Sequence, residues 1–471
     1  MLLNTLVKVL KEDCGVASSS QTLLLGFSGG PDSLALLHGL KTLGYSVTAA
    51  HFDHGLRAES VEDAKRALRL AAELDVPFVS ERGNVAGYAE TAKLSIEEAA
   101  RELRYRFLFG LAKQHGSQAV LVAHHTDDQV ETVLMHLLRG AGPAGLRGMA
   151  SRLLPNPWSE TIPLVRPMLE IWRKDIEQYC QDNHLDPIQD PSNQETTFFR
   201  NRLRREVIPF LETISPGLKA RLRNSAEILA SDYALLESLT KKAWIDCLSR
   251  REVNFLSLNR INFLSQPLAL QRTLLRRALV ELRPVQRDLD FDAVERAVGV
   301  INNPTGTATD WLAGLYLLIE EEHIWIADWD ADLPSDWPQV NEQVQHLAVP
   351  GSAQLNSPWK LTLDAVNNDT EQFQKNSDGY QAWVDLDAVG EELALRRRRP
   401  GDRFQPLGLA SGSLKLSDFM INEKIPQRAR AGWPLLCKGD EIVWVPGYRL
   451  AHPYRLMKQG RRALHLHLTK S

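Results

Sequence analysis

The sequence predicts an α/β protein with a doubly wound parallel sheet in an N-terminal domain, followed by a helical middle domain and a small α+β C-terminal domain. Short apolar runs alternate with helical patterns up to about residue 150, which is typical of a parallel sheet covered by helices. From Gly217 apolar residues recur every three or four positions, as in amphipathic helices. From Trp337 short strands punctuated by proline, glycine and asparagine follow. We therefore expect domains over 1–213, 214–336 and 337–471, in line with roughly 150 residues per domain.

The composition is that of an ordinary globular protein, with 44% hydrophobic and 24% charged residues. No run of ~18 apolar residues is present and the first residues do not resemble a signal peptide, so we expect a cytoplasmic protein without a membrane span. The net charge is −4, so any RNA contact must use local basic faces. The four cysteines lie far apart without a C-x-x-C pair, which argues against a zinc site, an iron–sulfur cluster or a dithiol centre.

The N-terminal domain is organised around a strand–turn–helix pattern. An apolar run from Leu23 to Phe27 predicts a buried strand, and leucines at helical spacing from Leu34 predict the helix after it. Glycines between them allow a tight turn, and amide groups at a helix start favour an anion. This turn contains neither GxxxxGK[ST] nor GxGxxG. We expect a phosphate-binding loop made of Ser28, Gly29, Gly30, Pro31, Asp32 and Ser33, although a plain structural turn would use the same residue types.

Two further strands and two helices are expected before residue 115. The strand over 46–52 carries His51 near its end, and Asp53 and His54 follow where a parallel sheet binds its ligands. A helix over 59–74 and a strand over 76–80 come next. Ser95 and Glu98 form a capping box that opens a helix to about His115. Arg104 shares a face of this helix with Arg101, where both are either solvated or part of a site.

A fourth strand over 119–123 leads directly into a cluster of polar residues. His124 follows the strand, and Thr126 with Gln129 suggests a capping box. Asp128 and Glu131 share one face of the first helical turn. They either complement the helix dipole or bind a magnesium ion or an amine. An H-x-x-x-H spacing is missing, so a zinc site is not expected.

The rest of the chain carries several basic stretches. Residues 139–148 predict a loop, 171–180 a short helix and 190–193 a turn. Four arginines within 199–209 form a stripe that either contacts RNA phosphates or is solvated. Helices are expected over 267–282 and 292–301, with a hairpin around 315–327. Basic residues with aromatic residues between them suggest an RNA surface in the C-terminal domain, comprising Arg396, Arg397, Arg398, Arg399, Arg403, Lys415, Lys424, Arg428 and Arg430.

Taken together, these motifs resemble those of the tRNA(Ile)-lysidine synthetases, a family within the N-type ATP pyrophosphatases. The matching strings are FSGGPDS at 27–33, HFDHGLR at 51–57, EEAARELRY at 97–105, AHHTDDQVET at 123–132, RGAGPAGLRGM at 139–149, DPSN at 190–193, RNRLR at 200–204, RRPGDRFQPLG at 398–408 and KIPQRARAGWPLL at 424–436. They span nearly the whole chain in the order of the family.

The resemblance implies a concrete reaction. Such an enzyme uses ATP to adenylate O2 of the wobble cytidine in the CAU anticodon of an isoleucine tRNA. The ε-amine of free L-lysine then attacks C2, which gives lysidine, AMP and pyrophosphate. The resemblance implies ATP and Mg²⁺ as cofactors and a tRNA-docking role for the middle domain. The oligomeric state stays open, with a homodimer as one option.

The resemblance also suggests roles for individual residues. The loop from Ser28 to Ser33 would hold the pyrophosphate, with Asp32 next to magnesium. Residues 51–54 would border adenine and ribose. Arg104, together with Arg101, would stabilise developing negative charge, and His124 would have an auxiliary role. Asp128 and Glu131 would receive the lysine ammonium group. Arg139 and Arg147 would become ordered when tRNA binds.

Two other functions share parts of this motif pattern. A tRNA 2-thiolation enzyme of the same ATP-pyrophosphatase class would need paired cysteines, and the sequence has none. An RNA-binding protein with a vestigial nucleotide pocket would not need the intact SGGPDS string or the acidic pair.

Overall fold

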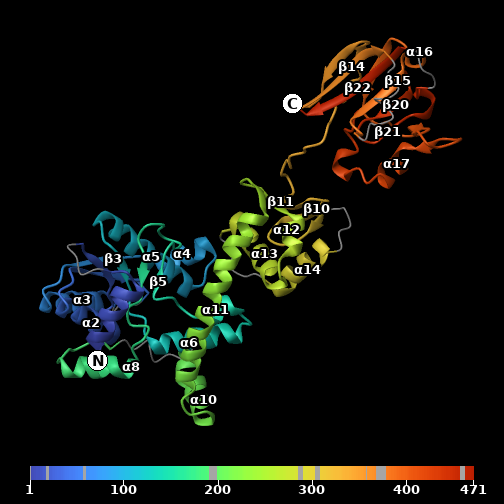
Figure 1. Ribbon diagram of the computed structural model, residues 1–471. Coiled ribbons are helices and arrows are strands. Elements are labelled where there is room, and N and C mark those ends of the chain that lie inside the picture. The colour runs from blue at the N-terminus through green and yellow to red at the C-terminus, as the bar shows by residue number, and fades with distance from the viewer. Residues whose placement is uncertain are drawn as a thin grey trace. The chain divides into compact units, whose positions relative to one another are not determined.

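The computed structural model describes residues 2–16, 21–56, 60–189, 199–284, 290–302, 308–356, 358–367, 378–456 and 462–470. The chain divides into two compact units, Met1–Ser238 and Leu239–Ser471 (Figure 1). This division does not test the boundaries of the three predicted domains, which stay a prediction. Among the described residues, none of the helices combines the length and apolar character needed to cross a membrane.

The first unit is built on a six-stranded sheet in the order β3-β2-β1-β4-β6-β5. All neighbouring pairs are parallel except β5 with β6. The strands are β1 (Leu23–Gly26), β2 (Val47–Asp53), β3 (Phe78–Arg82), β4 (Val120–Leu121), β5 (Arg152–Leu153) and β6 (Leu164–Val165). The α/β fold class with its parallel N-terminal sheet is confirmed.

Helices cover both faces of this sheet. Successive side chains of a strand point to opposite sides, so the apolar side chains of β1 pack into cores on both faces. Leu23 and Leu25 of β1 pack into a core with the first two helices, while Leu24 packs against Tyr105 and Leu108 of α5. All three leucines are fully buried. The helices are α1 (Leu2–Lys8), α2 (Pro31–Thr42), α3 (Ser60–Glu73), α4 (Val85–Ala92), α5 (Ile96–Gln114), α6 (Thr126–Leu138), α7 (Pro143–Leu146), α8 (Arg173–Asp182), α9 (Phe199–Arg202) and α10 (Ile208–Ile214), with π-helical turns at Val9–Asp13 and Leu203–Val207.

The predicted capping box of α5 is confirmed. The Ser95 hydroxyl accepts from the Glu98 amide at 3.2 Å, and the Glu98 carboxylate accepts from the Ser95 amide at 3.1 Å. Within the predicted loop 139–148, residues 143–146 form the helical turn α7, which begins at a proline. The predicted turn at 190–193 lies outside the described residues.

The capping box predicted for α6 is wrong by one residue. The N-cap is His125, whose Nδ1 accepts from the Asp128 amide at 3.4 Å, and Asp128 in turn accepts from the His125 amide at 3.0 Å. Thr126 is the first helical residue, and its hydroxyl donates to the Leu169 carbonyl. Gln129 uses its side-chain amide on the backbone of Met149. Tertiary partners therefore take the two side chains on which the local pattern relied.

The helix α11 (Leu218–Cys247) runs from the first unit into the second. The predicted helices are present as α13 (Leu268–Leu282) and α14 (Phe291–Asn302), and the predicted hairpin is β10 (Leu315–Ile319) with β11 (His323–Asp328). A short helix α12 (Arg260–Ser265) precedes α13. The hairpin belongs to a five-stranded sheet, β7-β8-β11-β10-β9, that the sequence did not predict; the other strands are β7 (Leu248–Arg251), β8 (Phe255–Asn259) and β9 (Thr309–Asp310).

The C-terminal part consists of strands with short helices, as predicted. One sheet has the order β12-β16-β19-β20-β21, a second has the order β13-β14-β22-β15, and β17 pairs with β18. These strands are β12 (Gln345–Ala348), β13 (Gly351–Gln354), β14 (Trp359–Asn367), β15 (Gln381–Asp385), β16 (Glu392–Arg396), β17 (Arg403–Phe404), β18 (Leu414–Lys415), β19 (Leu435–Lys438), β20 (Glu441–Val445), β21 (Arg449–Leu450) and β22 (Arg462–Lys470), with helices α16 (Leu386–Val389) and α17 (Leu416–Asn422). Their shared core includes the buried Trp433 and Trp444.

Candidate active site at the ends of β1 and β4

The predicted phosphate loop connects β1 to α2. Gly29 has φ of +78°, and a Cβ there would lie 2.5 Å from Ile188 Cδ1, so the turn requires glycine. Gly30 is the N-cap of α2 and Pro31 is its first residue. The Ser33 hydroxyl accepts from the Ser28 amide at 3.2 Å and donates to the Gly30 carbonyl at 3.2 Å. The two serines thus brace a preformed loop at a helix start, where an anion is favoured.

The end of this loop lies beside the start of α6, because β1 and β4 are neighbours in the sheet. His125 connects the two elements. Its Nε2 is 3.7 Å from Asp32 Oδ1 and 3.5 Å from Asp128 Oδ2, and the residue is 1% exposed. Sequence reasoning missed His125 and selected its neighbour. The available signal was its position directly before the helix start. Its residue type gave no signal, since histidine is not among the usual N-cap residues.

Asp32 has the features of a cation ligand. Its Oδ1 atom is buried and has no hydrogen-bond partner among the described residues. Burial and the nearby Asp128 raise the pKa of Asp32, against the lowering effect of His125. A cation would remove both costs. Among the described residues no group of three His, Cys, Asp or Glu side chains is arranged as a metal site. Proteins commonly bind Mg²⁺ through one or two carboxylates together with phosphate oxygens and water, and Mg²⁺ at Asp32 stays a prediction.

The acidic pair on α6 is in contact with two arginines from the basic stripe. Asp128 and Glu131 are 9% and 2% exposed. Arg200 donates to Glu131 Oε2 at 2.9 Å and to Asp128 Oδ1 at 3.1 Å. Arg204 donates to Glu131 Oε1 at 2.5 Å and to Asp128 Oδ1 at 3.1 Å. Burial alone would raise the pKa of Asp128, but His125 and Arg200 hold it below its usual value.

The two candidate nucleotide contacts on β2 are buried and point to the same face. His51 donates from Nδ1 to the Phe27 carbonyl at 2.9 Å, directly before the phosphate loop. Burial lowers the pKa of His51, so the ring is neutral near pH 7. Asp53 accepts from the Gly55 amide at 2.8 Å and lies 3.5 Å from Arg82 Nε. These contacts place both residues at the carboxyl end of β2, next to the loop.

A second group of basic side chains surrounds His124. Burial lowers the pKa of His124 to about 3, and the charges of Arg166, Arg104 and Arg200 act in the same direction. The charge of Asp128 opposes this shift. The neutral ring is therefore a weak base, and this weighs against proton removal by His124; its role stays a prediction. Arg104 and Arg166 each have a buried Nε without a hydrogen-bond partner in the described part of the chain. Arg166 was missed, although an arginine directly after the apolar pair of β6 was a readable signal.

The arginines of the glycine-rich segment and of α5 have aromatic partners. Arg147 Cζ lies 4.3 Å from the centre of the Tyr233 ring, and Arg101 Cζ lies 4.8 Å from that of Tyr105. Arg139 ends α6 as its C-cap and is exposed. These three side chains are not part of the cluster around His125.

The C-terminal basic stretch is only partly available to a ligand. Arg396 is 2% exposed and makes a bidentate ion pair with Asp402 at 2.8 and 3.0 Å, so its place in the predicted RNA surface is wrong. Arg428 donates to Glu320 at 2.8 Å and is also engaged. Arg397 is half-buried, whereas Arg398 is exposed. Fewer basic side chains are therefore free to contact RNA than the sequence predicts.

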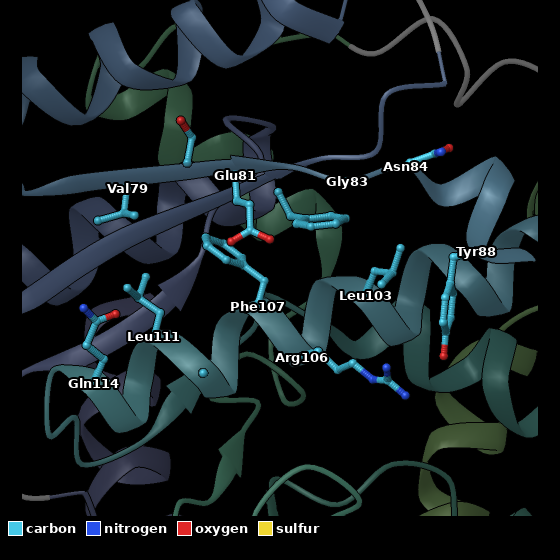
Figure 2. Close-up of a pocket in the computed structure, with 13 residues that line it drawn as sticks. Val79, Glu81, Gly83, Asn84, Tyr88, Leu103, Arg106, Phe107, Leu111 and Gln114 are labelled. Carbon is cyan, nitrogen blue, oxygen red and sulfur yellow. The ribbon is translucent and has the colours of Figure 1, made fainter.

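A cavity of about 630 Å³ lies elsewhere, between β3 and α5. Figure 2 shows Val79 and Glu81 of β3 facing Phe107 and Leu111 of α5 across it. Phe52, from the predicted segment 51–54, lines this cavity, but none of the residues of the phosphate loop or of the acidic pair does. The candidate site is therefore the cluster at the ends of β1 and β4.

Comparisons with known proteins show which proteins the chain is similar to. The chain matches the PP-loop domain over residues 3–211 and the TilS substrate C-terminal domain over residues 393–466. The tRNA(Ile)-lysidine synthase of Dehalococcoides mccartyi is 34% identical over 470 residues, covering 98% of each chain. That of Geobacter sulfurreducens is 32% identical, covering 97% of this chain and 95% of the relative. That of Bacillus subtilis is 31% identical, covering 91% and 90%.

Proposed function

Because this chain belongs to the tRNA(Ile)-lysidine synthase family, we propose that it ligates free lysine to C2 of the wobble cytidine in the CAU anticodon of an isoleucine tRNA, at the expense of ATP. The supporting observation is the meeting of two motifs at His125. Asp32 comes from the phosphate loop and Asp128 from α6, and His125 Nε2 lies 3.7 and 3.5 Å from their carboxylates. One site thus combines a place for pyrophosphate with a place for an amine.

In the first step, O2 of the cytidine attacks the α-phosphate of ATP, which gives an adenylated cytidine and pyrophosphate. The amides of the braced loop at the start of α2 hold the leaving pyrophosphate. His51 and Asp53 border the nucleoside part, since they end the adjacent strand β2. Mg²⁺ at Asp32 neutralises phosphate charge when bound. Arg104, whose Nε is buried and without a partner among the described residues, stabilises negative charge as it develops.

In the second step, the ε-amine of lysine attacks C2 and AMP leaves. The free amino acid carries an ammonium group with a pKa of about 10.4, which must lose a proton before attack. Asp128 and Glu131 are acidic, buried and next to the phosphate loop, so they suit recognition of that ammonium. The exposed Arg398 and the half-buried Arg397 are candidates for tRNA contact in the C-terminal domain. Homodimer formation stays a prediction.

The alternative of a 2-thiolation enzyme is disfavoured by the cysteines. All four are unpaired and buried. Burial raises the pKa of Cys14 to about 12 and that of Cys180, Cys247 and Cys437 to about 11. Such thiols are protonated at neutral pH and are poor sulfur carriers. A vestigial RNA-binding protein would not need the intact loop and the acidic pair.

The decisive experiment supplies the purified protein with ATP, labelled lysine and the isoleucine tRNA transcript with a CAU anticodon. We expect label in the RNA, together with one AMP and one pyrophosphate for each lysine. A transcript with another base at the wobble position serves as the control and should stay unlabelled. Binding of the RNA without incorporation of label would favour the vestigial alternative.

A further inference from the structure

Arg200 and Arg204 occupy the place that the proposed function assigns to the lysine ammonium. They lie on α9 and on the π-helical turn that follows it. Glu131 Oε1 accepts from Arg204 at 2.5 Å, and Glu131 Oε2 accepts from Arg200 at 2.9 Å and from Arg204 at 3.0 Å. Asp128 Oδ1 accepts from both arginines at 3.1 Å. The two guanidinium groups thus satisfy three of the four carboxylate oxygens.

The fourth oxygen is also in use. Asp128 Oδ2 accepts from the His125 amide at 3.0 Å, a bond that belongs to the capping box of α6. An incoming ammonium has three donors and needs carboxylate oxygens to receive them. In the arrangement described here, each oxygen of the pair already accepts a hydrogen bond. Glu131 Oε2 and Asp128 Oδ1 already accept two bonds each, which fills their two lone pairs, so an ammonium with three donors finds too few open acceptor sites unless an existing donor leaves.

The charges lead to the same conclusion. Two arginines on two carboxylates make a neutral cluster. A lysine ammonium added to it would leave an excess positive charge in a site where Glu131 is 2% exposed, and an uncompensated charge is costly away from water. Displacement of one guanidinium restores neutrality. The amine and the arginines are therefore competitors for the same position.

The arginines are the members of the cluster that can move. The side chains of Arg200 and Arg204 are 31% and 28% exposed, against 12% for Asp128 and 2% for Glu131. Their long stems can carry the guanidinium groups into water, whereas the carboxylates are held by α6. Arg202 of the same segment instead pairs with Glu206 at 3.1 Å and is 66% exposed. Only Arg200 and Arg204 among these three arginines face the acidic pair.

We propose that Arg200 and Arg204 are an internal occupant of the lysine site, and that lysine binds only to the fraction of molecules in which they have left Asp128 and Glu131. This inference rests on the proposed function. Its consequence is quantitative, because the apparent dissociation constant for lysine is the intrinsic constant divided by the open fraction. Removal of the arginines should therefore tighten lysine binding by the free enzyme.

The test is equilibrium dialysis of labelled L-lysine against the full chain without RNA. We compare the wild type with Arg204→Ala and with the double variant Arg200→Ala/Arg204→Ala. The dissociation constant should fall by about tenfold or more in Arg204→Ala, and further in the double variant. Arg202→Ala is the matched control, since it removes an arginine of the same segment without touching the acidic pair, and its constant should equal that of the wild type.

A second measurement separates occupancy from a general loosening of the site. Millimolar guanidinium chloride should refill the vacated position in Arg204→Ala and weaken lysine binding back towards the wild-type value, with little effect on the wild type. Melting curves establish that the variant is folded. If Arg204→Ala does not fold, Arg204→Gln, which keeps the stem and loses the charge, takes its place in both measurements.

The inference is overturned if the folded variants bind lysine no more tightly than the wild type does. Failure of the proposed function has a different signature, since the wild type would then place no labelled lysine in the tRNA. Label in the RNA combined with equal lysine affinities would reject the internal occupant and leave the proposed function standing.

Discussion

The carboxylate of Asp32 has one buried oxygen that, within the described part of the chain, accepts no hydrogen bond. We expect Asp32→Ala to lower AMP formation by roughly a hundredfold or more, because phosphate charge would lose its metal-mediated partner. Asp32→Asn, which keeps the shape without the charge, should fail to the same extent. The measurement is AMP release with tRNA and lysine present, alongside a melting curve. Activity near the wild-type level in either folded variant would contradict the metal role.

Glu131 allows a test of the amine site by kinetics. Glu131→Gln keeps the size of the side chain and removes its charge, so we expect the KM for lysine to rise about tenfold or more while the KM for ATP changes little. Because the change also weakens the pairing with Arg204, part of the loss is offset by easier opening. A lysine KM that stays at the wild-type value would remove Glu131 from the lysine site.

Two histidines make stability depend on pH. Burial, Arg104 and His51 lower the pKa of His54 to about 4, and burial with nearby arginines lowers that of His124 to about 3. Below pH ~6.5 the unfolded chain binds protons that the folded one excludes, so the free energy of unfolding should fall as pH decreases from 6.5 to 5, by up to about 1.4 kcal/mol per pH unit for each histidine. Urea unfolding of His124→Gln over this range should give a shallower dependence.

The places of Asp32, Asp128 and Glu131 in the fold could be predicted from sequence, whereas their roles stay predictions. Each lies in the first two turns of a helix that follows a buried strand, and the ends of neighbouring parallel strands meet. The arginine partners of the acidic pair could not be predicted from the sequence. Arg200 lies 69 positions from Glu131, and nothing in the stripe distinguishes an arginine that turns inward from Arg202, which turns outward.

At the level of elements, the phosphate loop depends on one backbone conformation. We expect Gly29→Ala to lower the free energy of unfolding by roughly 1–3 kcal/mol and to impair AMP formation, since φ of +78° is strained for alanine and the new Cβ would clash with Ile188. Gly44→Ala is the matched control: its φ is +79° but no atom lies within 4 Å of its Cβ position. Thermal melts and AMP assays compare the two. Equal losses in both variants would mean that the close approach to Ile188 does not matter.

Elements with a local signature were predicted, and those defined by distant pairing were not. The capping box of α5 depends on Ser95 and Glu98 alone, so the sequence sufficed. The N-cap of α6 was misplaced because His125 acts there through its ring, which a residue-type rule does not expect. The strand β8 was missed because a five-residue run such as FLSLN does not reveal its partner, here β11 more than sixty positions away.

At the scale of the whole molecule, RNA binding should depend on the exposed Arg398 and the half-buried Arg397 of the C-terminal part. We expect Arg397→Ala/Arg398→Ala to weaken tRNA binding and to reduce the slope of log K against log salt by roughly one to two units. Arg396→Ala should instead lower the melting temperature, because it leaves Asp402 without its buried partner. Filter binding at several salt concentrations gives the slope. An unchanged slope in the double variant would mean that these arginines are only solvated.

The order of the structural types along the chain could be predicted from the hydrophobic periodicity of the sequence. Parallel sheets, amphipathic helices and short antiparallel strands each leave a different periodicity. The availability of each basic residue could not be predicted. Arg396 and Arg398 are two positions apart in one run of four arginines, yet the first is buried against Asp402 and the second is exposed. Arg396 is the last residue of β16, whereas Arg398 lies beyond the end of the strand, and composition does not record where the strand ends.

The strand β22 has a consequence for biosynthesis. It lies between β14 and β15 in their sheet, and it pairs with β14 over nine residues. During translation, β14 and β15 leave the ribosome before β22. The strand β14 can pair with β13, but no strand connects β14 to β15 until residues 462–470 emerge. This half of the protein therefore folds late, and a nascent chain stalled before that point would expose two unpaired edges to chaperones and proteases.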